Sequence, residues 1–226
     1  MKFRIQSQSE HRTSAISFLC WTRNALFVVG VLALGYYGGV ALDAKIYQRY
    51  QTQQFQRAAE EAKPLSPVRL TSPGAPRYVQ AGSPLGQIQI RKIGLAVMIL
   101  EGTDKRTLRR AVGHISETAL PGETGNVAIA GHRDTFFRNL RTLEKNDEIT
   151  LTTLDNTYRY LVDFSEVVEP NDTDVLEASD NATLTLVTCY PTWYIGPAPK
   201  RLIVHAHLEG ARAAADETRT VARAVP

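Results

Sequence analysis

Cysteine is scarce in this sequence. Only Cys20 and Cys189 occur among 226 residues, which leaves little basis for a disulfide framework. Internal repeats, phosphate-binding glycine motifs and lysine-rich helices are also missing, so nothing indicates nucleotide or nucleic-acid binding. With 43% hydrophobic and 22% charged residues, the composition is not that of a disordered or collagen-like chain. The length allows one domain with appendages or two small domains.

A strong charge of one sign is missing as well. The net charge of +3 is unevenly distributed. Residues 1–85 carry 10 Lys and Arg against 4 Asp and Glu, whereas residues 86–209 carry 13 against 17. The basic surplus is therefore N-terminal, and the region that could form a domain is mildly acidic. This distribution gives no support to a nucleic-acid partner.

An uncharged run occupies residues 25–42. As a helix, eighteen residues would span about 27 Å, enough to cross the hydrocarbon of a membrane. Trp21, Tyr36 and Tyr37 suit the two interfaces, where amphipathic rings gather. A cleaved signal peptide is the alternative, but its apolar region is normally about 7–15 residues long. We therefore expect an uncleaved transmembrane anchor.

The segments around the domain have distinct compositions. Residues 43–63 place aromatic and alanine residues at helical spacing, and residues 64–84 contain five prolines. These patterns predict a short helix followed by a semi-rigid extended spacer. Residues 210–226, rich in alanine and arginine, are expected to be a flexible tail.

The region from residue 86 onward predicts a mostly β domain. Apolar residues alternate at 88–90 and again at 95–99, which predicts a β-hairpin. Asp104 is placed to cap a short helix that runs to Val112, with Gly113 as its stop. Six or seven short strands with only brief helices predict a closed barrel or a sandwich. The remaining strands are expected at 127–130, 148–153, 158–168, 183–189 and 201–208.

Cys189 ends one of these strands, just where the chain enters the loop of residues 190–200. Strand ends that open into loops hold catalytic groups rigidly and leave them accessible. If the anchor crosses the membrane, Cys20 lies on the other side and cannot pair with Cys189. The alternative is that Cys189 has only a structural role, as a small buried apolar side chain. Its position favours a nucleophile.

A thiol nucleophile needs a base or a cation nearby, because an ordinary thiol is mostly protonated at neutral pH. His132 follows the strand at 127–130 and can act as base toward the thiol and as acid toward a leaving amine. Arg201 opens the strand after the cysteine loop and offers fixed N–H donors for an oxyanion. Together the three residues could supply a nucleophile, an acid or base, and a donor for the oxyanion that forms when a carbonyl is attacked.

These segments resemble the sortase family of membrane-anchored cysteine transpeptidases, most closely its class D branch. The family's Thr-Leu-x-Thr-Cys strand end appears as TLVTC at residues 185–189. The histidine appears in NVAIAGHRDTFF, and the arginine follows a Gly-Pro-Ala-Pro loop. The resemblance covers roughly residues 86–208. It implies an eight-stranded β-barrel with short helices, preceded by one transmembrane helix.

The resemblance also implies a two-step reaction. The Cys189 thiolate would attack the Thr carbonyl of an LPxTG-like C-terminal sorting signal and form a thioester, while His132 protonates the departing amine. Arg201 would stabilise the oxyanion. An amine from peptidoglycan or from another surface protein would then take the acyl group. No cofactor is implied.

Substrate contacts and location follow from the same resemblance. Thr188 would help to hold the substrate or the arginine, and Tyr190 and Pro191 would border the peptide groove. The protein would cross the bacterial cytoplasmic membrane once, with its N-terminus inside. The expected layout is a cytoplasmic segment at 1–24, the anchor at 25–42, a helical stalk and linker at 43–85, an outer catalytic domain at 86–209 and a tail at 210–226.

Several other residues carry weaker hypotheses. Asp134 could orient His132, although we expect it to cap a helix instead. His205 and His207 share a strand face with Arg201 and could join His132 in a metal site, but a paired exposed face is the preferred interpretation. His114 is expected to be structural. The seven acidic residues within 163–180 could bind Ca²⁺, with a solvated loop as the default and no metal site assigned.

Two other functions compete with the transpeptidase. One is a membrane-tethered assembly factor that keeps the barrel and binds partners without catalysis. The other is an L,D-transpeptidase, whose usual His-Gly-x-x surroundings of the cysteine are absent here.

Overall fold

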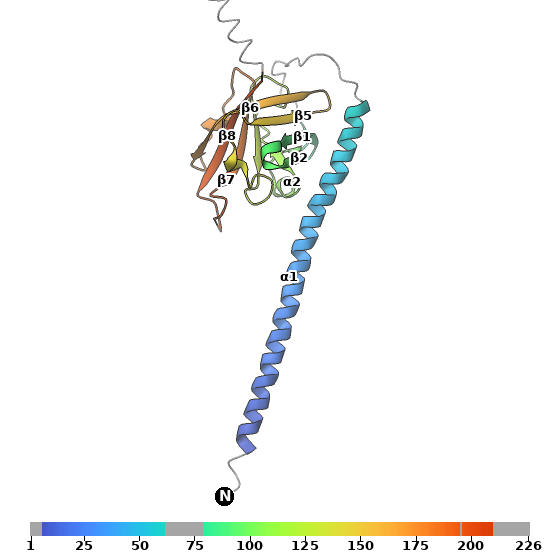
Figure 1. Cartoon of the computed structure of the whole chain (residues 1–226), viewed down its shortest axis with the longest axis vertical. Coiled ribbons are helices and arrows are strands. Elements are labelled where there is room, and N and C mark those ends of the chain that lie inside the picture. The colour runs from blue at the N-terminus through green and yellow to red at the C-terminus, as the bar shows by residue number, and fades with distance from the viewer. Residues whose placement is uncertain (1–5, 62–78, 195, 210–226) are drawn as a thin grey trace, which may run out of the picture. The chain divides into compact units, whose positions relative to one another are not determined.

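Eight strands form a closed β-barrel in the order β1-β2-β3-β4-β7-β8-β6-β5 (Figure 1). The structure is a computed structural model, and it describes residues 6–61, 79–194 and 196–209. The barrel confirms the mostly β expectation, and the alternative of a sandwich was wrong. The strands are β1 (Pro84–Ile90), β2 (Leu95–Glu101), β3 (Val112–His114), β4 (Asn126–Gly131), β5 (Glu148–Thr152), β6 (Thr157–Val168), β7 (Thr183–Tyr190) and β8 (Lys200–Leu208).

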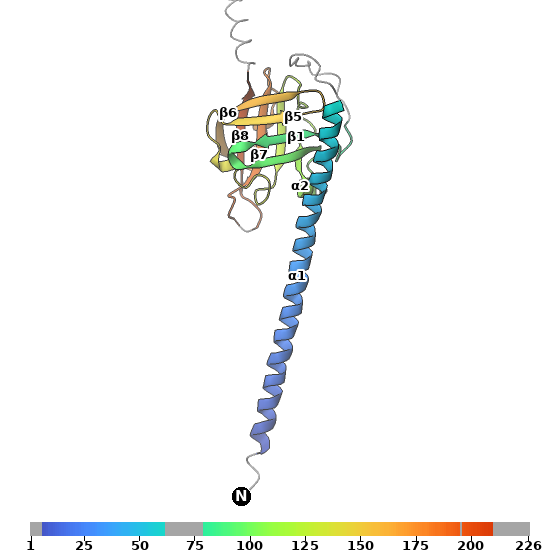
Figure 2. The same ribbon diagram turned by 45° about the vertical axis from the view of Figure 1, so that its right-hand side comes forward.

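The barrel closes through pairing of β1 with β5, and Figure 2 shows β6, β5 and β1 side by side in one wall. β1 and β2 form the expected antiparallel hairpin around the 3-10 turn Arg91–Ile93. Gly94 follows that turn with φ 65°, a left-handed conformation that glycine adopts without steric cost. Most neighbouring strands are antiparallel, but β2 pairs with β3 and β4 pairs with β7 in parallel. The parallel pair β4–β7 matters for the candidate site.

Alternate residues of the strands fill the barrel interior. The phenol of Tyr160 is buried without a hydrogen-bond partner among the described residues, and burial raises its pKa above the ordinary value. The aliphatic residues of the interior on β1, β2, β4 and β7 are Ile88, Ile90, Leu95, Val97, Ile99, Val127, Ile129, Leu184 and Leu186.

The helix expected at 104–112 is shorter than predicted. α2 (Lys105–Arg110) is capped by Asp104 as expected, but the chain is already extended at Ala111, where φ is −151°. Val112 is fully buried and pairs with Ile99, so residues 112–114 become strand β3. The prediction that Gly113 stops the helix was therefore wrong, because strand pairing and burial of Val112 prevail over the local helix signal.

The N-terminal part forms one helix, α1 (Gln6–Glu61), which includes both the uncharged run and the expected stalk. Among the residues described, no helix is both long and apolar enough to cross a membrane, so the anchor expected at 25–42 is not supported by the structure. The proline-rich spacer up to residue 78 and the tail from residue 210 lie outside the described residues. The chain divides after Lys45 into two compact units.

Within the second unit, α1 packs on the outer face of β2. The buried Met98 and Leu100 point away from the barrel interior and form a small apolar cluster with Ala111, against which Tyr47 packs. The Gln48 amide donates to the Arg110 carbonyl (Nε2 to O, 2.6 Å) and accepts from the Met98 N–H (3.0 Å). On β2, the residues that pair with β3 are Ile99–Glu101, so Met98 lies one residue before the β2–β3 ladder begins.

Replacement of Gln48 tests this contact. We expect Gln48→Ala to lower the free energy of unfolding by about 1–3 kcal/mol, because it removes the partner of the Met98 N–H. Gln53→Ala, at an exposed position on the same helix, should leave it within about 0.5 kcal/mol of the parent. Chemical denaturation of the full-length protein followed by circular dichroism measures both. Equal stabilities for the two variants would contradict the assignment.

Candidate active site

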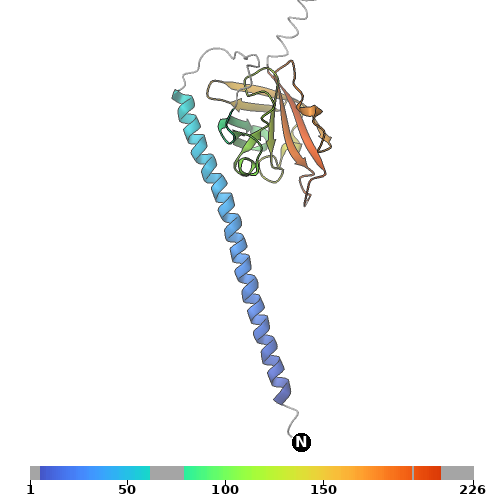
Figure 3. The same cartoon turned by 180° about the vertical axis from the view of Figure 1, so that it is seen from behind.

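The structure brings His132, Cys189 and Arg201 together at the ends of three neighbouring strands, of which β7 and β8 lie side by side in orange and red in Figure 3. In the parallel pair β4–β7, Gly131 is the partner of Thr188. His132 and Cys189 are the next residues on the two chains. Cys189 is in turn the direct partner of Arg201 on β8. With neighbouring strands about 4.8 Å apart, the three residues form one row across the sheet.

The side chains of Cys189 and Arg201 lie on the outer face of the barrel. Leu186 on β7 and Leu202 on β8 belong to the barrel interior, and Cys189 and Arg201 each lie an odd number of positions away. Both are half-buried. Directly opposed residues of an antiparallel pair have Cβ atoms about 5 Å apart, so the guanidinium can reach the surroundings of the thiol.

His132 belongs to the same face. Val127 and Ile129 of β4 point into the interior, so the alternation places Ala130 and then His132 outside. His132 is exposed, immediately after the buried Gly131. An exposed imidazole beside a half-buried thiol can exchange protons with a substrate that approaches from solvent.

Thr188 fixes the register of this row. Its hydroxyl donates to the Gly131 carbonyl (Oγ1 to O, 2.8 Å), and the side chain is only 2% exposed. The bond therefore joins the residue before the cysteine to the residue before the histidine. The expected role of Thr188 in holding the substrate stays a prediction, since its described hydrogen bond is internal.

The turn after β4 packs tightly on its own glycine. A Cβ at Gly131 would lie 2.6 Å from the ring of Phe137, which is fully buried. The Phe137 N–H donates to the His132 carbonyl (3.0 Å). No helix begins at Asp134, so the prediction of a cap there was wrong; burial of Phe137 folds the segment into turns instead. No described hydrogen bond joins Asp134 to His132.

The loop after Cys189 carries the other predicted residues. Tyr190 is half-buried and packs against the barrel core. The Tyr190–Pro191 peptide bond is cis. Arg201 donates from Nη1 to the Lys200 carbonyl (3.0 Å) and the Ala198 carbonyl (3.4 Å), which holds its guanidinium beside this loop. Its Nε and Nη2 have no hydrogen bond to a described residue.

Comparison with known proteins identifies the family of this chain. Residues 88–209 match the family model described as the sortase domain. The chain belongs to the sortase family. It is 30% identical to Sortase D of Bacillus subtilis (strain 168) over 187 residues, which cover 80% of this chain and 94% of that protein. It is 26% identical to Sortase A of Bacillus anthracis over 199 residues, which cover 83% of this chain and 93% of that protein.

Solved sortase structures are similar in fold to this chain. A Sortase D5 transpeptidase of Clostridium perfringens matches with a TM-score of 0.57 at 32% identity, over 74% of this chain and 98% of that one. Sortase E of Streptomyces avermitilis matches with a TM-score of 0.52 at 32% identity, over 58% of this chain and 91% of that one. The resemblance to sortases, and to class D in particular, is confirmed, and the chain is a sortase-type cysteine transpeptidase.

Sequence reasoning missed two residues that hold the loops of this sortase. Asn126 is buried at the start of β4, donates to the Val175 and Glu177 carbonyls of the β6–β7 loop (3.1 and 3.2 Å) and accepts from Thr185 Oγ1 (2.8 Å). Arg133 binds two carbonyls of the β7–β8 loop. Neither carried a signal in the sequence, because each binds loop carbonyls that are 49 to 63 residues away along the chain.

His205 and His207, considered together with His132 as metal ligands, each pair with a carboxylate in the sortase barrel. His205 Nε2 lies 3.0 Å from Glu166 Oε1, and His207 Nδ1 lies 2.9 Å from Asp163 Oδ1. These pairs link β8 to β6, which the sequence spacing could not indicate. Within the described part of the chain, no group of three or more His, Cys, Asp or Glu side chains could hold a metal ion.

His114 on β3 forms a buried pair with Glu101 on β2. Its Nδ1 lies 2.7 Å from Glu101 Oε2, and its Nε2 lies 2.9 Å from the Ala119 carbonyl. His114 and Glu101 are 1% and 4% exposed. Both ring nitrogens are therefore occupied by internal partners, which fits the structural role expected for this histidine.

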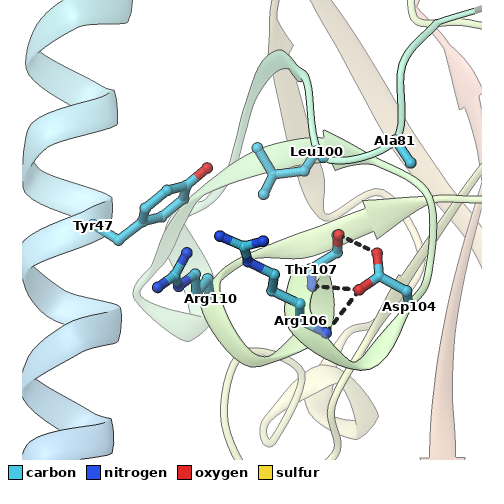
Figure 4. Close-up of a pocket in the computed structure, with 8 residues that line it drawn as sticks. Tyr47, Ala81, Leu100, Asp104, Arg106, Thr107 and Arg110 are labelled. Carbon is cyan, nitrogen blue, oxygen red and sulfur yellow. Dashed lines mark hydrogen bonds between the residues drawn. The ribbon is translucent and has the colours of Figure 1, made fainter.

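A pocket of about 420 Å³ lies elsewhere on the sortase, between α1 and α2 (Figure 4). None of the predicted site residues lines it. Asp104 accepts from the Thr107 hydroxyl (2.6 Å) and from the Arg106 and Thr107 N–H groups, and these bonds lower its pKa, the hydroxyl most. The Arg110 guanidinium lies 5.1 Å from the centre of the Tyr47 ring. Several polar groups of the pocket thus bind one another.

Thr188→Val tests the link between β7 and β4. We expect a loss of about 1–3 kcal/mol in the free energy of unfolding, because the buried Gly131 carbonyl loses its donor while the side-chain volume is kept. Thr157→Val, at an exposed position on β6, should change stability by less than about 0.5 kcal/mol. Thermal unfolding of both variants gives the comparison. A Thr188→Val protein as stable as the parent would show that the bond contributes nothing.

Proposed function

We propose that this sortase cleaves an LPxTG-like C-terminal sorting signal through a thioester on Cys189 and transfers the protein to an amine of the cell envelope. The amine would come from peptidoglycan or from another surface protein. One observation carries the proposal: the direct pairing of Cys189 with Arg201, with His132 at the adjoining position of the β4–β7 register, on one face of the barrel.

The first step forms the thioester. The Cys189 thiolate attacks the carbonyl carbon of the signal's threonine, and the C–N bond of the peptide breaks. The His132 imidazolium gives its proton to the departing amine, which leaves as the C-terminal fragment. The exposed position of His132 supports this role, because a general acid must reach the leaving group of a bound peptide.

The second step releases the product. Neutral His132 takes a proton from the incoming amine, whose nitrogen attacks the thioester carbonyl, and the C–S bond breaks. This restores the thiolate and the imidazolium. Arg201 stabilises the oxyanion in both steps, since its guanidinium carries several N–H donors and a full positive charge. Its bonds to the Lys200 and Ala198 carbonyls support this by limiting where the guanidinium can move.

Peptide cleavage tests the catalytic assignments. We expect the full-length protein in detergent to cleave a fluorogenic LPxTG or LPxTA peptide. Cys189→Ala should abolish cleavage, and His132→Ala and Arg201→Ala should each lower kcat/KM by about 100-fold or more, as the loss of an acid–base group or an oxyanion donor does. The matched control is Cys20→Ala, which removes the other, exposed cysteine and should keep full activity.

The same assay separates the transpeptidase from a non-enzymatic assembly factor. An added amine, such as triglycine, should form a transfer product that mass spectrometry detects. Undiminished cleavage by Cys189→Ala, or no cleavage of any LPxTG-like peptide by the parent, would rule out the proposed chemistry.

We also propose that residues 25–42 anchor the protein in the bacterial cytoplasmic membrane, with the N-terminus inside and the catalytic domain outside. This run has no charged residue. Its large apolar side chains are more than half exposed on α1, among them Leu26, Phe27, Val29, Leu32 and Leu34. Apolar side chains that no protein surface covers are stable in lipid and costly in water.

The two cysteines report the topology. A membrane-impermeant maleimide applied to intact protoplasts should label the parent protein through Cys189. It should label Cys189→Ala only after lysis, because Cys20 then is the remaining thiol and lies inside. Labelling of Cys189→Ala on intact protoplasts, or recovery of the protein in the soluble fraction, would contradict the proposed anchor.

A further inference from the structure

Arg133 joins the turn after His132 to the loop after Cys189. Its guanidinium donates from Nη1 to the Pro191 carbonyl (3.2 Å) and from Nη2 to the Gly196 carbonyl (2.7 Å). Pro191 lies two residues after Cys189, and Gly196 lies in the second half of the same loop. One side chain therefore binds both halves of the segment between β7 and β8.

This loop has few other means of holding its shape. The β7–β8 ladder ends at the pair Tyr190 and Lys200. Pro191, Pro197 and Pro199 have no N–H to donate. Among the described residues, the backbone bond within the loop beyond the ladder joins the Tyr194 N–H to the Pro191 carbonyl and is long, at 3.4 Å. Arg201 binds the Ala198 and Lys200 carbonyls at the end of the loop, and the two Arg133 bonds, both shorter than this backbone bond, hold Pro191 and Gly196.

Arginine suits such a position. Its planar guanidinium presents several N–H groups in a fixed geometry, so one side chain can satisfy two carbonyls at once. Bonds from a charged donor are stronger than those between neutral groups. No described carboxylate forms an ion pair with Arg133, so the backbone carbonyls are its described polar partners.

We propose that Arg133 is a positioning residue: it ties the β7–β8 loop to the turn that carries His132, so that the loop bordering the sorting-signal peptide and the His132–Cys189 pair keep one fixed arrangement. The inference rests on the proposed function, since it assigns the loop to the same site. Arg133 acts through the loop and does not itself touch the reacting atoms.

Two variants and a control test this proposal in the full-length protein. Arg133→Met removes both bonds and keeps most of the side-chain volume. Arg133→Lys keeps the charge, but its single ammonium replaces a planar group that spans two carbonyls. Arg138→Met removes an exposed arginine from the same turn, one whose side chain makes no described hydrogen bond.

The first measurement reports the loop itself. Trp193 and Tyr194 are exposed, at 80% and 42%, and offer chymotrypsin sites within the loop. We expect Arg133→Met to be cut there at least 10-fold faster than the parent, Arg133→Lys at an intermediate rate, and Arg138→Met at the parent rate. This measurement does not depend on catalysis, so it remains valid if the proposed reaction fails.

The second measurement separates binding from chemistry. For LPxTG peptide cleavage we expect Arg133→Met to raise KM by about 10-fold or more with a smaller change in kcat, Arg133→Lys to recover part of the loss, and Arg138→Met to match the parent. Unchanged loop cleavage, unchanged KM despite a released loop, or equal effects of Arg133→Met and Arg138→Met would each overturn the proposal. Should Arg133→Met prove unstable, Arg133→Lys carries the same comparisons.

Discussion

The candidate site depends on the parallel pairing of β4 with β7. Because Gly131 and Thr188 are partners in that ladder, the residues that follow them, His132 and Cys189, leave the sheet at the same level. The buried bond from the Thr188 hydroxyl to the Gly131 carbonyl holds this register at its last step. A shift by one residue would turn one of the two side chains to the opposite face of the sheet.

Two loops near His132, Cys189 and Arg201 are bound by residues at the two ends of β4. Asn126, at the start of β4, binds the β6–β7 loop, and Arg133, just after its end, binds the β7–β8 loop. Both loops are therefore attached to the strand that leads to His132. β4 therefore contacts both loops, through Asn126 at its start and Arg133 just after its end.

Much of the fold and of the candidate site could be predicted from the sequence. The other features depended on pairing between distant segments. The period-2 alternation identified the strands at 88–90 and 95–99, and strand ends pointed to His132, Cys189 and Arg201. Sequence reasoning failed at Val112, where pairing with Ile99 ended the helix early, and at Asp134, where burial of Phe137 replaced a helix by turns. The partners of His205, His207 and Arg133 come from segments whose proximity no local pattern could indicate.

In the proposed reaction Cys189 carries the acyl group. The most direct measurement is mass spectrometry of the full-length protein after reaction with an LPxTG peptide and acid quenching, followed by proteolytic mapping. We expect one adduct with the mass of the LPxT acyl portion on Cys189, none on Cys20, and loss of the adduct on treatment with hydroxylamine, which cleaves thioesters. An adduct on another residue, or peptide turnover with no adduct on Cys189, would contradict it.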